Sequence, residues 1–271
     1  MRTIALLLVC CPYMAGQSRA GAESTRSLLE KVRNGPITVE VVAALKARAD
    51  DPQVIPALRD AFALARVSGA VLSEPGVFGM HASQFLAITL SGLGVSDDAF
   101  IEELAKIPRV AIDADPPVAY LNNADGKMDP KAGHNPSFDA WCAKRNLDFA
   151  PCLSLFISYT MDIEWLGVAT DRRAIPVLRQ VLGMSNASMV IVAVIGLARL
   201  NDTASLPLIA QSGLRFSPLE AELIVISALD YTDPAVEGLF NRFISNPEKR
   251  EKVMTDWRAR HQSAPAPNRK Q

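Results

Sequence analysis

The sequence predicts an all-α protein that is assembled from repeated pairs of helices. Three observations lead to this fold class. Asp171, Asp202 and Asp233 follow one another at intervals of 31 residues. The segments between them place apolar side chains at helical spacing. Hydrophobic residues make up 49% of the chain and charged residues 21%, which supplies a core and excludes a disordered or collagen-like chain.

The N-terminal segment has the layout of a cleaved secretory signal peptide over residues 1–22. An apolar stretch over 4–16 follows a basic residue, and small residues precede the expected cleavage after Ala22. The stretch is shorter than the roughly 20 residues that a membrane-spanning helix needs. Lipid attachment at Cys10 or Cys11 is the open alternative. The sequence therefore predicts a secreted or periplasmic protein with no membrane contact after cleavage.

Helices are predicted in order along the rest of the chain from their apolar spacing and from Gly-Pro breaks. Before the middle of the chain they cover 24–32, 38–49, 51–66, 82–93 and 97–107. Helix pairs then run from 151 to 244, and a highly charged helix over 247–260 closes the array. Terminal repeats need a polar outer face, so this last helix is expected to be a cap. Residues 261–271, with two prolines, are predicted to form a disordered tail.

Each repeat is expected to begin with an aspartate whose carboxylate accepts hydrogen bonds from the free N–H groups of the first helical turn. The predicted anchors are Asp51, Asp98, Asp171, Asp202 and Asp233. In three repeats an Ile or Leu follows at the fourth position and a proline at the fifth. A proline that far into a helix removes a backbone hydrogen bond, so the sequence predicts a recurrent kink.

These repeats resemble short HEAT repeats. The resemblance rests on Asp171-x-x-Ala174-Ile175-Pro176-x-Leu178-x-x-x-Leu182 and Ala193-x-x-Gly196-Leu197-Ala198-x-Leu200. It is good over 151–244 and fair over 38–107, where Asp98 is followed by two glutamates in place of the Ile-Pro pair. The resemblance implies a right-handed α-solenoid over 23–260 whose curved surface binds other proteins, and it implies no catalytic residues. A generic helical bundle remains the alternative.

The stretch over 108–151 interrupts the period with six prolines and an Asp-Gly turn, and is predicted to be an irregular insertion. Signal cleavage leaves Cys142 and Cys152 in an oxidising compartment, where thiols tend to pair. We therefore predict a disulfide that pins the insertion. The open alternative is a catalytic Cys142 with His134 as its partner.

With 28 basic and 29 acidic residues, the net charge of −1 does not favour nucleic acid as a partner. No phosphate loop, nucleophile elbow or zinc-binding helix motif occurs, so the sequence favours a binding protein over an enzyme and implies no cofactor. Its partner is predicted to be another protein or a peptide.

The alternative function is an enzyme or a Ca²⁺-binding module in the insertion. Its candidate residues are Asp125, Asp129 and His134, with further oxygen ligands at Asp113, Asp115 and Asn122. When Gly126 is aligned with the glycine of an EF-hand loop, the acidic residues at both ends are missing. Turn formation explains the same Asn, Asp and Gly residues.

Overall fold

The structure is a computed structural model that describes residues 23–72, 80–120, 129–169 and 171–262. These residues form α-helices joined by turns and short 3₁₀ helices, which confirms the all-α class. The predicted signal peptide over 1–22 lies outside the described residues, as does all but the start of the predicted tail over 261–271. None of the helices in the described part combines the length and the apolar character needed to cross a bilayer.

The chain divides into two compact units, Met1–Ser96 and Asp97–Gln271, and each is described by itself. Unit 1 holds α1 (Thr25–Asn34), α2 (Val39–Lys46), α3 (Val54–Ser68) and α4 (Ala82–Gly92). Helix α1 packs against α2 and α3, and α3 packs against α4. Ser24 and Thr38 are the N-caps of α1 and α2. Their hydroxyl oxygens accept hydrogen bonds from the backbone N–H groups of Ser27 and Val41, as is usual for Ser and Thr at this position.

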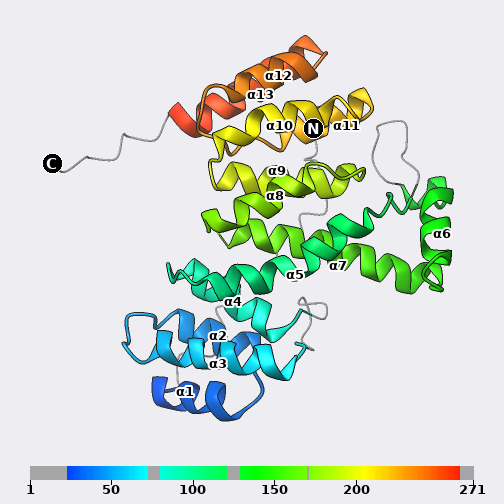
Figure 1. Cartoon of the computed structure of the whole chain (residues 1–271). Coiled ribbons are helices and arrows are strands. Elements are labelled where there is room, and N and C mark those ends of the chain that lie inside the picture. The colour runs from blue at the N-terminus through cyan, green and yellow to red at the C-terminus, as the bar shows by residue number, and fades with distance from the viewer. Residues whose placement is uncertain (1–22, 73–79, 121–128, 170, 263–271) are drawn as a thin grey trace. The chain divides into compact units, whose positions relative to one another are not determined.

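Unit 2 holds the remaining helices (Figure 1). They are α5 (Asp98–Ala114), α6 (Pro136–Ala143), α7 (Phe149–Val168), α8 (Ile175–Val181), α9 (Ala187–Arg199), α10 (Leu206–Gly213), α11 (Pro218–Ile226), α12 (Val236–Phe243) and α13 (Pro247–Gln262). Three 3₁₀ helices, η2 (Pro130–Ala132), η3 (Arg172–Ala174) and η4 (Thr203–Ser205), precede α6, α8 and α10.

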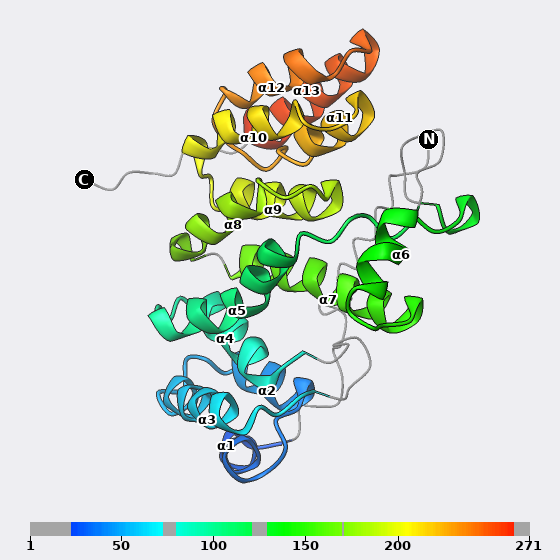
Figure 2. The same cartoon turned by 45° about the vertical axis from the view of Figure 1, so that its right-hand side comes forward.

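The helices of unit 2 pack in pairs, and each pair packs on the next. Helix α5 packs on α7, α8 on α9, α10 on α11 and α12 on α13. One layer consists of α7, α9 and α11. The other contains α5, α8, α10 and α12, in which α5 contacts α8 and α10 contacts α12. Both cartoon views show these successive pairs side by side (Figure 2). The core lies between the two layers and includes Ile163, Leu178, Val194, Leu197 and Phe240, none of which is more than 1% exposed.

Hydrogen bonds join segments that are 28 to 31 residues apart in the sequence. Tyr231 Oη donates to the Asp202 carbonyl (3.2 Å), and the Thr232 N–H donates to Asn201 Oδ1 (3.1 Å). Arg172 Nη1 reaches the Leu200 carbonyl (3.4 Å). The segments around Asp171, Asp202 and Asp233 therefore lie next to one another, as the 31-residue spacing predicts.

The predicted recurrent kink is wrong. Pro176 and Pro207 lie in the first turn of α8 and α10, because the residues after each aspartate form the 3₁₀ helices η3 and η4. Pro56 likewise lies in the first turn of α3. In the first turn of a helix the N–H groups have no partner within the helix, so a proline there removes no hydrogen bond. Asp171 and Asp202 therefore precede a 3₁₀ turn, and the proline is the second residue of the α-helix that follows.

Candidate functional site

The predicted anchor residues do not all have the same role. Asp51, Asp171 and Asp233 each accept the backbone N–H two residues ahead, at 3.0, 2.9 and 2.8 Å. At the second predicted anchor the cap is one residue earlier, because Asp97 accepts the Ala99 N–H (2.9 Å) and Asp98 is already helical. Asp98 instead forms an ion pair with Arg173. A hydrogen bond from Arg173 also lowers the pKa of Asp171.

Asp202 is the clearest correction, because its carboxylate caps no helix. It is 5% exposed and is held by Arg179 through Nε (2.9 Å) and Nη2 (2.7 Å), with the Ser205 hydroxyl as a further donor. Arg179 comes from the preceding repeat, which sequence spacing does not reveal. Burial, and secondly the charge of Asp202, raise the pKa of the Tyr231 phenol, which remains neutral and donates to this network.

The predicted insertion over 108–151 is shorter and more helical than expected. Helix α5 continues through Pro108 to Ala114, and α7 begins at Phe149, before Pro151. Helix α6 lies within the insertion and was not predicted. Asn135 caps α6 and Pro136 is its first residue, so a start signal for this helix is present in the sequence.

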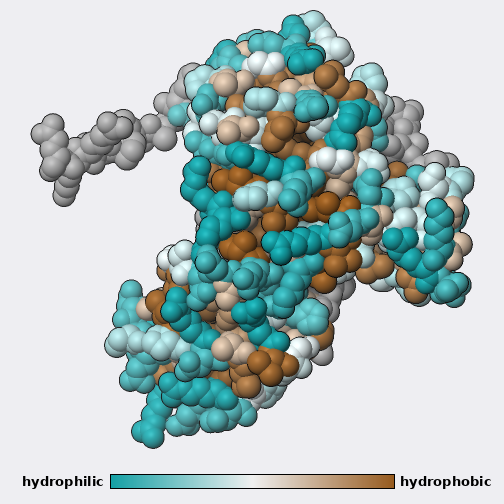
Figure 3. All heavy atoms as spheres, viewed as in Figure 1, coloured by the Kyte–Doolittle hydropathy of each residue, from teal (hydrophilic) through white to brown (hydrophobic). Residues whose placement is uncertain are grey.

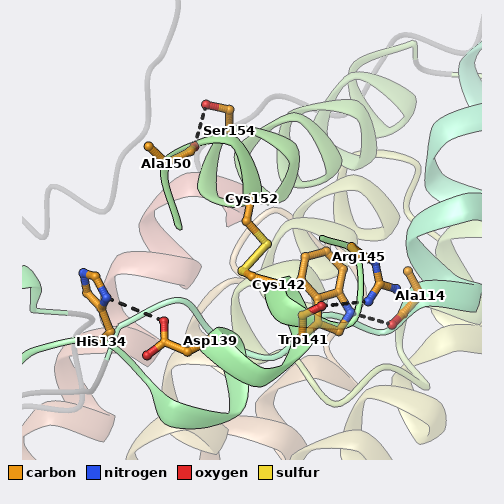
Figure 4. The surroundings of a disulfide bond; sticks show 9 residues. All are labelled: Ala114, His134, Asp139, Trp141, Cys142, Arg145, Ala150, Cys152 and Ser154. Atoms are coloured by element: carbon orange, nitrogen blue, oxygen red, sulfur yellow. Dashed lines mark hydrogen bonds and ion pairs between the residues drawn. A yellow bond between two sulfur atoms is a disulfide. The ribbon is translucent and has the colours of Figure 1, made fainter. Parts of the chain in front are cut away.

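Cys142 of α6 and Cys152 of α7 form a disulfide in the structure (Figure 4), with their Cα atoms 5.7 Å apart. Both residues are buried, at 3% and 0% exposure. Beside the bond, the Arg145 guanidinium stacks on Trp141 at 3.8 Å, and Trp141 Nε1 donates to the Ala114 carbonyl (3.2 Å). The disulfide therefore attaches α6 to α7 next to the end of α5. Because Cys142 forms this disulfide, it has no free thiol to act as the nucleophile of the alternative catalytic hypothesis.

The residues proposed for a metal or catalytic site do not converge. Asp115 accepts the Ser185 N–H (2.8 Å), and Asp129 accepts the Lys131 N–H (2.9 Å). The His134 ring stacks on Phe149, with ring centres 3.5 Å apart, and its Nδ1 lies 3.6 Å from Asp139. Asp113 is exposed at the end of α5. The other two candidates, Asn122 and Asp125, lie outside the described residues, and among the described residues no group of three or more potential metal ligands occurs.

The structure instead brings together a set of partly exposed side chains on α7, α9 and α11, most of them apolar. They occupy the positions 14, 10, 7 and 3 residues before Asp171, Asp202 and Asp233. The four rows across the helices are Ile157, Ser188 and Leu219; Met161, Val192 and Leu223; Glu164, Ile195 and Ile226; and Val168, Arg199 and Asp230. We call this set the α7–α9–α11 face.

Burial is the same along three of the four rows of the α7–α9–α11 face, the exception being the row that begins with the exposed Ile157. The two central rows are half-buried throughout, and the row of Val168, Arg199 and Asp230 is exposed throughout. Eight of the twelve side chains are apolar. The space-filling view shows hydrophobic residues reaching the surface of unit 2 between polar ones (Figure 3). Because α7 contacts α9 and α9 contacts α11, the rows run across neighbouring helices.

The opposite layer also exposes two apolar side chains, Leu208 and Leu214, but the positions 31 residues away from them carry no exposed apolar side chain. The exposed side chains that recur at this period on α8, α10 and α12 are polar. Gln180 of α8, Gln211 of α10 and Arg242 of α12 are 31 residues apart and all exposed. Polar side chains on the outside of a helix are what solvent alone requires. The apolar rows on the α7–α9–α11 face therefore need another explanation.

Glu164 is the one ionisable side chain in the two central rows. Burial raises the pKa of its carboxyl group, and the positive charge of Arg199 opposes that shift. Within the described residues no basic nitrogen lies at ion-pair distance from Glu164. The exposed Asp230 forms an ion pair with Arg260 at 3.4 Å.

This face is not among the features predicted above, although the sequence contains a signal for it. The 31-residue period relates the residues before each aspartate as well as those after it. Applied to the residues before each aspartate, the same period aligns Met161, Val192 and Leu223. A sequence period does not predict which apolar stripe of a helix remains partly exposed, because that depends on how the neighbouring helices pack against it.

Comparison of the chain with protein-family models, curated proteins and solved structures finds no match to any of them.

Proposed function

We propose that this protein is an exported HEAT-like repeat scaffold that binds another protein or a peptide through the α7–α9–α11 face. The observation that carries the proposal is the set of apolar rows, repeated on three adjacent helices and left partly exposed. Contiguous exposed apolar surface is costly in water and is typical of sites where a partner docks. Stacked helix pairs provide such surfaces in repeat proteins.

Two further features support this proposal. Hydrogen bonds between successive segments of unit 2 join residues 28 to 33 positions apart, the pattern expected where each repeat contacts its neighbours. The buried Cys142–Cys152 bond fits an oxidising compartment outside the cytosol. A right-handed solenoid and export through the segment over 1–22 are part of the same proposal.

To test the proposal, peptides from a displayed random library are selected for binding to the protein expressed from the 271-residue sequence. The test variant carries Ile157→Lys and Val168→Lys, which place charges on the face at side chains that are 46% and 38% exposed. The control carries Leu208→Lys and Leu214→Lys at the other layer, where the exposures are 39% and 62%. All four positions are accessible, and a lysine stem tolerates apolar surroundings, so both variants should fold.

We expect the selected peptides to bind the control variant as they bind the unmodified protein, and to bind the test variant about tenfold more weakly or worse. Affinities are measured by isothermal titration calorimetry, and circular dichroism checks the fold of each variant. The proposal would be overturned if both variants lost peptide affinity equally, or if the test variant bound the peptides as tightly as the unmodified protein.

A further inference from the structure

In the two central rows of the α7–α9–α11 face, Glu164 is a single acidic group among apolar side chains. On α7, Glu164 lies one turn from Met161 and one turn from Val168. In its row, the equivalent positions of α9 and α11 hold Ile195 and Ile226. The side chains beside this carboxylate are apolar and form no hydrogen bonds with it, and among the described residues no cation lies at contact distance. Arg199 acts on it only as a nearby charge.

We propose that the partner of this face is a peptide segment whose apolar side chains flank a lysine or arginine, and that Glu164 is the acceptor for that cation. The inference rests on the proposed function, since it names the chemistry of the partner that the face binds. It makes Glu164 the specificity-determining residue and the eight apolar side chains the source of affinity.

Charge complementarity favours a cationic partner over an anionic or a wholly apolar one. An apolar partner would remove Glu164 from water without replacing the lost hydrogen bonds, which costs free energy. An anionic partner would be repelled by the Glu164 carboxylate, and this repulsion is screened less at the partly buried central rows than at exposed positions. Arg199 is exposed at the edge of the face, where it would contribute little to the recognition of an anion.

Burial already raises the pKa of Glu164, so the charged form of this residue destabilises the free protein. A carboxyl group with a raised pKa costs stability at neutral pH, and the cost disappears as the pH falls through that pKa. Replacing Glu164 by glutamine removes the charge and keeps the shape. We therefore expect Glu164→Gln to melt at the same temperature as the unmodified protein at pH 7 or at a higher one, while losing selectivity for cations. If Glu164 instead stabilised the fold, Glu164→Gln would melt at a lower temperature than the unmodified protein.

The experiment is a double-mutant cycle with a peptide obtained in the display selection described above. The peptide with its lysine or arginine, and a matched peptide with glutamine at that position, are titrated into the unmodified protein and into Glu164→Gln. We expect the glutamine peptide to bind the unmodified protein about tenfold more weakly, equivalent to about 1.4 kcal/mol. With Glu164→Gln the two peptides should differ by about twofold or less.

The control variant is Asp230→Asn, which removes an exposed acidic group in the outer row and should leave the tenfold preference intact. Two failures are distinguishable. If peptides bind through the face but carry no conserved cation, or if the preference survives Glu164→Gln, the inference about Glu164 is wrong and the proposed function stands. If no peptide depends on the face, the proposed function itself fails.

Discussion

At the residue scale, equal spacing in the sequence does not imply equal chemistry. Asp202 and Asp233 are 31 residues apart and begin equivalent segments. Asp233 caps a turn through the Ala235 N–H (2.8 Å), whereas Asp202 is buried against Arg179. The difference arises because Arg179 of the preceding repeat reaches the Asp202 carboxylate.

This difference predicts unequal costs for the same substitution. Asp202→Ala leaves the Arg179 guanidinium without its bidentate partner and is expected to lower the free energy of unfolding by about 3 kcal/mol. Asp233→Ala removes one exposed cap and should cost about 1 kcal/mol. Urea denaturation of both variants measures the two losses. Equal losses would mean that the ion pair of Asp202 with Arg179 adds no more to stability than the Asp233 cap does.

At the element scale, the contact between α7 and α9 depends on two glycines. A Cβ atom added at Gly167 would lie 2.6 Å from the Gly196 Cα, closer than real Cβ contacts come, and this neighbour is backbone rather than the end of a flexible side chain. The two helices therefore approach each other more closely here than side chains would permit. This close approach helps to place the rows of the α7–α9–α11 face side by side.

We expect Gly167→Ala to destabilise the protein by about 2 kcal/mol, because the new methyl group must push α7 and α9 apart. The matched control is Gly238→Ala in α12, where an added Cβ would meet nothing within 4 Å. There the better helix propensity of alanine should add about 0.5–1 kcal/mol to stability. Thermal melting followed by circular dichroism measures both, and a stabilising Gly167→Ala would show that the close approach is not needed.

At the scale of the whole molecule, the chain forms two compact units, of which unit 2 is the larger. Within unit 2, α9 contacts the neighbouring helices α7, α8 and α11, and the long-range hydrogen bonds join adjacent repeats. Stability in such an array is approximately a sum of local and nearest-neighbour contributions. Damage at one place is therefore expected to remain local.

The disulfide tests this expectation. Cys142 and Cys152 close a short loop, and by the loop-entropy estimate replacing both by serine costs roughly 2–3 kcal/mol. Because the bond attaches α6 to α7, the loss should appear as faster amide hydrogen exchange in α6 and the start of α7, with α11 unchanged. A uniform increase across unit 2 would indicate global destabilisation instead.

The sequence by itself determined the features that depend on local chemistry. Apolar side chains at helical spacing predicted the all-α class, and short polar residues marked the starts of helices, as Thr38 does for α2. The 31-residue spacing predicted that the Asp171, Asp202 and Asp233 segments lie side by side. The cysteine count predicted the pair that forms the disulfide. These features follow from residues that are close in the chain or equivalent in a period.

Only the tertiary structure decided which groups from different repeats meet. It placed Arg179 on Asp202, extended α5 past Pro108, and left one apolar stripe of α7, α9 and α11 partly uncovered. Spacing along one helix identifies which side chains share a face, but burial depends on what the neighbouring helices bring to that face. For that reason the repeat was visible in the sequence, and the face that we propose for binding was not.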